Sequence, residues 1–189
     1  MYGEGRRLLD EVSVRESSAR PFAFEAQCGG EWFVLHVKPR QEKCVADTLE
    51  AMNTRYYLPL TRQVRYYGTR RAVVESPLFP GYLFLRGSID DAYDADRTRR
   101  VVQVIRVIDQ RHINWELENL YVALSRNAPL QQFAYLKTGV RVEVRSGPFR
   151  GLQGIVAGTA GNSRLVLQIR TLSQAVSLEI DGSLLDVIS

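Results

Sequence analysis

The hydrophobic pattern of the chain changes character once, near residue 127, and this change limits the folds open to it. Before that point, strand-like apolar runs alternate with stretches of helical period. After it, short β-type segments follow one another between glycine-rich turns. Strands mixed with helices are typical of an α+β domain, whereas a run of short strands is typical of a small barrel. With 189 residues, the chain is long enough for both.

The first part of the pattern predicts an α+β domain over residues 31–126. Residues 1–30 have few apolar side chains and no sustained period, so we predict a flexible N-terminal tail there, with a short helix near Arg6–Val14. The apolar run Trp32–Val37 predicts a strand, and an amphipathic helix follows it. We expect an antiparallel sheet with helices packed on one face and the other face open.

The second part predicts a small all-β domain over residues 137–189. Residues 127–136 carry a proline and no clear period, and are predicted to be a linker. Beyond them, valines at 140, 142 and 144 alternate with charged residues, and further β-branched segments follow. Five short strands in so few residues predict a five-stranded barrel.

Composition narrows the functional classes. The two cysteines and two histidines are too few for a disulfide framework or a common metal site, so we predict no metal and no cofactor. No stretch reaches the roughly 20 apolar residues of a membrane helix, so we expect a cytoplasmic protein without a membrane partner. The net charge of +4 is mild, and only three of the 25 basic residues are lysines. An anionic partner and a biased genome composition both account for the arginine excess.

An arginine- and tyrosine-rich stretch, Arg55–Val74, is the main basic feature. It holds five arginines and four tyrosines, contains no acidic residue, and has a hairpin turn at Gly68. Because arginine contacts phosphates and tyrosine stacks on bases, we consider nucleic-acid contact through residues such as Arg70 and Arg71. The alternative is a ribbon with one solvated face. A smaller basic cluster surrounds Arg99.

Two further features bear on function. On a strand, Tyr82 and Phe84 point to the same side, and periodicity alone leaves open whether that side is core or exposed. Four acids lie within Asp90–Asp96, as in some metal-dependent nucleases, but a neighbouring catalytic base or lysine is missing. We interpret these acids as a solvated helix face and predict that the protein is not an enzyme.

Four strings resemble one known family. They are WFVLHVKPRQE at Trp32–Glu42, YLPL at Tyr57–Leu60, SPLFPGYLFL at Ser76–Leu85 and GVRVEVRSGPFRGLQGIV at Gly139–Val156. The first three resemble the N-terminal domain of the NusG/RfaH family of transcription elongation and antitermination factors, and the fourth resembles a KOW domain. The strings are closest to specialised paralogues of the family, and a housekeeping factor is the alternative.

The resemblance implies three sets of site residues. In the family, aromatic residues on the open sheet face bind the clamp helices of the largest RNA polymerase subunit. These correspond here to His36, Tyr82 and Phe84, and the correspondence implies that both Tyr82 and Phe84 are exposed. The loop and first helix contact the non-template DNA strand, and with the basic clusters above the expected nucleic-acid-binding residues are Lys38, Arg40, Lys43, Arg70, Arg71 and Arg99. The KOW domain recruits a ribosomal small-subunit protein or Rho, here through Phe149, Arg150, Ile155 and Val156.

The sequence therefore predicts a monomeric, two-domain transcription elongation and antitermination factor. It would hold RNA polymerase through its N-terminal domain and a second partner through its KOW domain. A general KOW-type RNA-binding protein is the alternative, because KOW domains also occur in ribosomal proteins.

Overall fold

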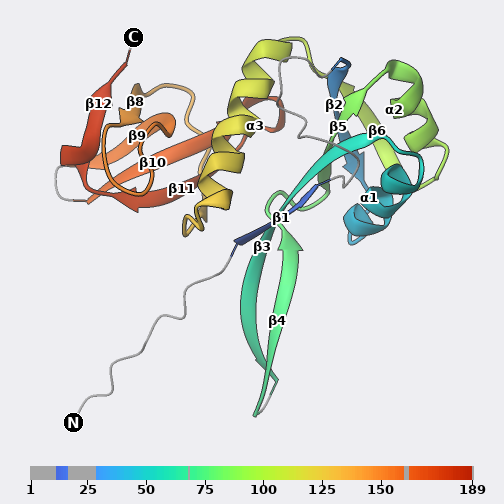
Figure 1. The fold of residues 1–189 in the computed structure, drawn as a ribbon, viewed down its shortest axis with the longest axis horizontal. Coiled ribbons are helices and arrows are strands. Elements are labelled where there is room, and N and C mark those ends of the chain that lie inside the picture. Colours follow the sequence, from blue (N-terminus) through green and yellow to red (C-terminus); the bar gives the residue numbers. More distant parts are fainter. Residues whose placement is uncertain (1–11, 17–28, 68, 160–161, 189) are drawn as a thin grey trace.

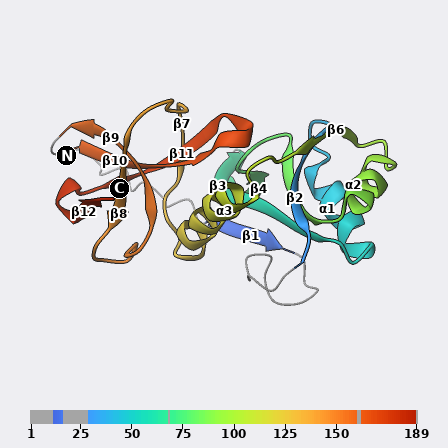
Figure 2. The same cartoon turned by 90° about the horizontal axis from the view of Figure 1, so that it is seen from above.

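The computed structural model describes residues 12–16, 29–67, 69–159 and 162–188, which form two antiparallel sheets with a long helix between them (Figure 1). Among these residues, no helix is long and apolar enough to cross a membrane. The element between the sheets is α3 (Gln110–Ser125), whose N-cap Asp109 accepts a hydrogen bond from the backbone N–H of His112. The view from above shows α3 beside both sheets (Figure 2).

The N-terminal sheet has six strands and forms the expected α+β domain with three helices. Its order is β1-β3-β5-β2-β6, and β4 pairs with β3. The strands are β1 (Val12–Glu16), β2 (Glu31–Val37), β3 (Arg55–Tyr67), β4 (Arg70–Pro77), β5 (Tyr82–Gly87) and β6 (Val101–Arg106), and the other two helices are α1 (Glu42–Ala51) and α2 (Ile89–Asp96).

Both faces of this sheet are covered, so the expectation of an open face is wrong. Strand β2 is apolar at consecutive positions, as is typical of a strand buried on both sides. Phe33 and Leu35 pack in one buried cluster with residues of α1 and α2. Trp32 and Val34 point to the other side and belong to a second cluster that includes the apolar stripe of α3.

The all-β region that follows also has six strands, one more than predicted. They are β7 (Gln131–Phe133), β8 (Val140–Val144), β9 (Gln153–Thr159), β10 (Asn162–Ile169), β11 (Gln174–Ile180) and β12 (Leu185–Val187), in the order β12-β8-β9-β10-β11-β7. Two 3₁₀ turns, η1 (Arg170–Leu172) and η2 (Gly182–Leu184), connect strands. The extra strand β7 comes from the predicted linker, where it pairs with β11.

A piece of the predicted N-terminal tail is also structured. Val12–Glu16 forms β1 and pairs with Tyr57–Thr61 of β3, where a short helix was expected up to Val14. The strand supplies partners for backbone groups of β3 that would otherwise form an unpaired edge. The rest of the tail prediction falls on residues 1–11 and 17–28, outside the described residues.

Candidate functional site

A stacked pair of rings, His36 and Tyr82, lies at one end of the sheet face that α3 covers. The two residues are directly opposite in the β2–β5 ladder, and their ring centroids are 5.0 Å apart with planes inclined by 22°. Both side chains are half-buried, so each remains partly accessible to solvent. The family resemblance had grouped these two residues, whereas alternation along the strand had linked only Tyr82 and Phe84.

Phe84, the third residue of the expected aromatic patch, is fully buried, and its predicted exposure is wrong. It lies one position further along the same face, 6.2 Å from the ring of Tyr57 and 6.4 Å from that of Phe79. Tyr121 of α3 packs edge-on against Tyr57 at 6.4 Å. Helix α3 therefore closes the face over Phe84 but leaves Tyr82 at its margin.

A buried carboxylate holds the turn that carries Tyr82. Glu42, in the first turn of α1, is 5% exposed and accepts a hydrogen bond of 2.8 Å from the backbone N–H of Gly81. Gly81 has φ +84°, a conformation that favours glycine, and its carbonyl accepts from the N–H of Val37. These contacts tie α1, β2 and the turn together, so Glu42 fixes the position of the His36–Tyr82 pair. No periodic signal in the sequence pointed to this role.

Beside the aromatic pair lies a largely apolar groove of about 780 Å³. It runs between the His36 end of β2, the loop before α1 and the base of β4. Its apolar lining includes Val37, Pro39, Val74, Pro77, Pro80 and Val102. The sequence pattern did not predict this groove, because its lining comes from segments up to 66 residues apart, from His36 to Val102. The two prolines of the string at Ser76–Leu85 were the available signal.

Three of the expected nucleic-acid-binding residues come together at the rim of the groove. Lys38 and Arg40 lie in the exposed loop before α1, and Arg99 lies in the exposed turn before β6. The backbone N–H of Lys38 donates to the carbonyl of Arg100 at 2.9 Å, which joins the loop to the turn. We call Lys38, Arg40, Arg99 and Arg100 the basic loop cluster.

Backbone conformation in the basic loop cluster is unusual for arginine. Arg40 has φ +64° and Arg99 has φ +60°, both in the left-handed region. A residue other than glycine adopts this region at a cost, and such positions gather at functional sites.

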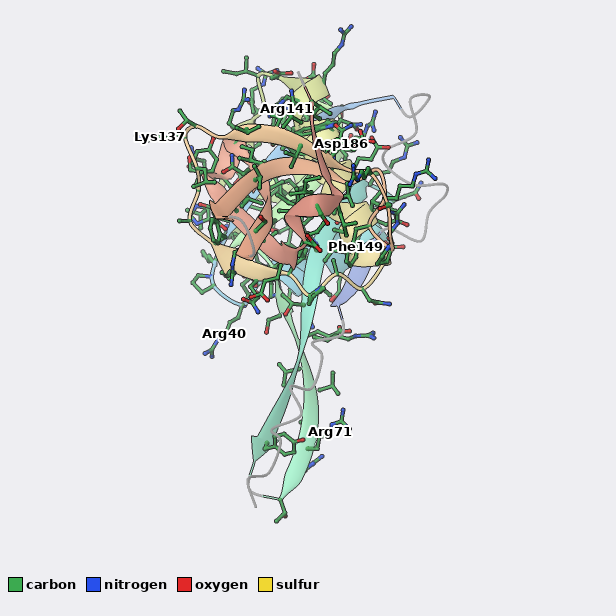
Figure 3. The ribbon with its side chains drawn as sticks, turned by 90° about the vertical axis from the view of Figure 1, so that its left-hand side faces the viewer. Arg40, Arg71, Lys137, Arg141, Phe149 and Asp186 are labelled. Atoms are coloured by element: carbon green, nitrogen blue, oxygen red, sulfur yellow. The ribbon has the colours of Figure 1, made fainter. Side chains whose placement is uncertain are left out.

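Lys43, by contrast, is already paired. Its ammonium lies 3.6 Å from Oε2 of Glu75. The other carboxylate oxygen of Glu75, Oε1, accepts a hydrogen bond of 2.9 Å from Arg62. These groups sit at the base of the β3–β4 ribbon. Arg70 and Arg71 are exposed at the far end of the same ribbon, well away from Arg40 (Figure 3).

The C-terminal candidates lie partly against α3. Ile155 lines a cavity of about 340 Å³ between α3 and the C-terminal sheet, and the carbonyl of Arg150 accepts a hydrogen bond of 2.7 Å from Arg126, directly after α3. Phe149 and Val156 are half-buried against the core that α3 shares. The expected partner surface therefore overlaps with the contact between the two sheets.

A polar cluster on α3, which sequence analysis did not identify, faces the same cavity. Burial raises the pKa of the Glu116 carboxyl to about 7, and burial likewise lowers the pKa of the His112 imidazole, with Arg170 adding to the effect. His112 Nε2 lies 2.9 Å from Glu116 Oε1, and the backbone N–H of Arg170 donates to the carboxyl at 3.0 Å. Asp109 and Arg141 are the other charges that act on this pair. The environment favours the uncharged forms of both groups.

Residues 30–119 match the NusG family model, described as "Transcription termination factor nusG". No curated protein matches the chain. The matched segment runs from the start of β2 into α3 and contains the His36–Tyr82 pair, the apolar groove and the basic loop cluster. Residues 30–119, slightly less than half of the chain, are therefore similar to the NusG family of transcription termination factors.

Proposed function

We propose that this protein is a transcription elongation and antitermination factor that binds bacterial RNA polymerase through its NusG-family domain. The observation that carries the proposal is the partly exposed His36–Tyr82 pair beside a large apolar groove. Aromatic residues at the margin of an apolar depression are typical anchors of a protein interface. Binding energy, and not chemistry, would produce the effect by favouring one conformation of the polymerase.

The groove fits the family's partner, the clamp helices of the largest polymerase subunit. An apolar groove takes up the apolar face of an amphipathic helix. Val102, on the groove wall, is 55% exposed and has no cover within the described chain. A helix in the groove would bury it together with Pro77 and Pro80.

The basic loop cluster supports a second contact, with the non-template DNA strand. Arg40 belongs both to this cluster and to the groove lining, so a polymerase in the groove would lie next to it. Exposed arginines and lysines contact phosphates without reading sequence. We therefore assign Lys38, Arg40 and Arg99 to DNA contact, and expect Lys43 to contribute less, because Glu75 already pairs with it.

For the C-terminal region we propose the KOW role, recruitment of a ribosomal small-subunit protein or of Rho. Phe149, Arg150, Ile155 and Val156 would form the contact. A partner that covers Ile155 would lie directly beside α3, since both line the same cavity. The strings Lys38–Arg40 and Pro77–Phe84 favour an operon-specific paralogue over a housekeeping factor.

The decisive experiment is binding of the full chain to bacterial core RNA polymerase. We expect the His36→Ala, Tyr82→Ala double variant to bind at least about tenfold more weakly, as is usual when interface anchors are truncated. Tyr93→Ala is the matched control, because Tyr93 is 54% exposed on α2, on the opposite face of the sheet. Circular dichroism establishes that each variant is folded. A wild-type chain without affinity for the polymerase overturns the proposal and favours the alternative of a general KOW-type RNA-binding protein.

A further inference from the structure

The β3–β4 ribbon extends beyond the body of the molecule (Figures 1 and 3). Strand β1 pairs with β3 only as far as Thr61, and from Arg62↔Glu75 to Tyr67↔Arg70 the six residue pairs of the ribbon join β3 and β4 alone. At about 3.4 Å per residue, this outer part is about 20 Å long. A two-stranded ribbon of this kind contributes little to the stability of the fold. Its length is therefore better explained by a function than by stability.

Side chains near the end of the ribbon are open to solvent. Tyr66 is 60% exposed and Val73 is 57% exposed, and Arg70 and Arg71 are exposed as well. Tyr66 and Arg71 are directly opposite in the ladder and so share one face of the ribbon. This face presents a cation, an aromatic ring and an aliphatic side chain together.

Charge along the ribbon is divided between base and end. At the base, Glu75 pairs with both Arg62 and Lys43. Beyond it, residues 63–74 carry three arginines and no acidic residue. In the part of the chain that the structure describes, neither Arg70 nor Arg71 forms an ion pair. The end of the ribbon is thus a concentrated positive charge about 20 Å from the body.

We propose that this ribbon is an arm that binds duplex DNA by lying in the major groove, with Arg70 and Arg71 on the phosphates. The major groove of B-form DNA, about 12 Å wide, admits a two-stranded β-ribbon. The major groove of A-form RNA is too narrow for one. Single strands bind on rows of stacked aromatic rings, whereas the next pair on the face of Tyr66 and Arg71 is Val64↔Val73, so this face offers no such row. The contact is independent of DNA sequence, because it is made to the backbone.

This inference goes beyond the proposed function, since it requires neither the groove nor a polymerase. It is tested with the full chain and a 20-base-pair DNA duplex by fluorescence anisotropy, in a series of salt concentrations. Contacts of Arg70 and Arg71 with two phosphates predict a slope of log K against log salt of about −1.8. We expect the Arg70→Gln, Arg71→Gln double variant to bring that slope close to zero and to weaken binding about tenfold or more at low salt.

The matched control is Arg106→Gln, Arg111→Gln, which removes the same charge from two exposed arginines outside the ribbon. It should retain the slope and nearly all of the affinity. A wild-type chain that does not bind the duplex, a double variant that binds like wild type, or an equal loss in the control would overturn the proposal. Equal or tighter binding of an RNA duplex or of single-stranded DNA of the same length would do so too.

Binding to core RNA polymerase separates this proposal from the previous one. The ribbon variant should retain polymerase affinity, because Arg70 and Arg71 do not line the groove. The His36→Ala, Tyr82→Ala variant should lose polymerase affinity and retain duplex binding. Each proposal can therefore fail while the other stands.

Discussion

The two faces of the N-terminal sheet are closed in different ways. On one face, Leu49 of α1 and Ala92 of α2 pack with sheet residues in a cluster drawn wholly from the N-terminal α+β domain. On the other, Leu117 of α3 belongs to a cluster that continues into the C-terminal sheet through residues such as Leu165 and Leu167. One face thus completes a domain, while the other joins two sheets in a common core.

Polar contacts follow the same division. Trp115 and Asn119 of α3 form hydrogen bonds of 3.0 and 2.9 Å with Gln153 of β9, and Arg141 of β8 lies over the Trp115 ring at 4.7 Å. Helix α2 instead satisfies its own N-terminus through Ser88 and Asp91. We therefore expect a change in α3 to alter the stability of both sheets, and a change in α1 or α2 to alter that of the N-terminal sheet only.

Truncation of a core leucine should give the largest effect. Leu117→Ala and Leu49→Ala both remove a fully buried side chain, and each should lower the free energy of unfolding by about 2–5 kcal/mol. Urea denaturation measures the loss, and hydrogen exchange read by mass spectrometry locates it. We expect Leu117→Ala to reduce protection in both sheets and Leu49→Ala to reduce it in the N-terminal sheet only. Identical exchange patterns would contradict the division between the faces.

A change of pH should act on the shared face through Glu116. Its pKa is about 7 in the folded protein against an ordinary value of 4.5, so the folded state holds the proton more tightly than the unfolded chain does. Ionisation of Glu116 therefore costs stability as the pH rises from 4.5 to 7.

The Glu116→Gln variant cannot ionise at this position. Relative to wild type it should gain about 3 kcal/mol of unfolding free energy across that window, at about 1.4 kcal/mol per pKa unit. Urea denaturation at several pH values measures the gain. A difference between the two proteins that stays constant from pH 4.5 to 7 would refute the assignment.

Removal of one indole hydrogen bond should have a smaller effect. Trp115→Phe leaves the side-chain oxygen of Gln153 without this donor, at a cost of about 1–2 kcal/mol. Trp32→Phe is the control, because the indole of Trp32 donates to Asn114 of α3 and not to a residue of β9. Both variants should be destabilised, but only Trp115→Phe should raise hydrogen exchange in β9. No change in β9 would mean that this bond does not contribute to docking.

Loss of a helix cap should give the smallest effect, about 1 kcal/mol. Asp109→Ala removes the cap of α3, and Ser88→Ala removes that of α2. Thermal denaturation should show similar losses for the two variants. Exchange in the C-terminal sheet should rise for Asp109→Ala alone; a rise for Ser88→Ala would show that the faces are coupled through the sheet itself.

Local pattern was sufficient for most of the regular elements. The apolar run at Trp32–Val37 predicted β2, and valines at alternate positions predicted β8, because strand and helix periods are set by neighbouring residues. The strands Val12–Glu16 and Gln131–Phe133 were not predicted. Each forms by backbone hydrogen bonds to a strand distant in sequence, β3 for the first and β11 for the second.

The candidate site was predictable only in part. The sequence by itself determined that Tyr82 and Phe84 share a sheet face and that Arg70 and Arg71 belong to an acid-free hairpin, because both follow from spacing along one strand or turn. Only the tertiary structure decided that Phe84 is buried while Tyr82 stays at the margin. Which of the two is buried depends on how far α3 extends over the sheet. This helix begins 26 residues after Phe84. The order of residues fixes which side of a strand a side chain takes, but what covers that side depends on packing between segments far apart in the chain.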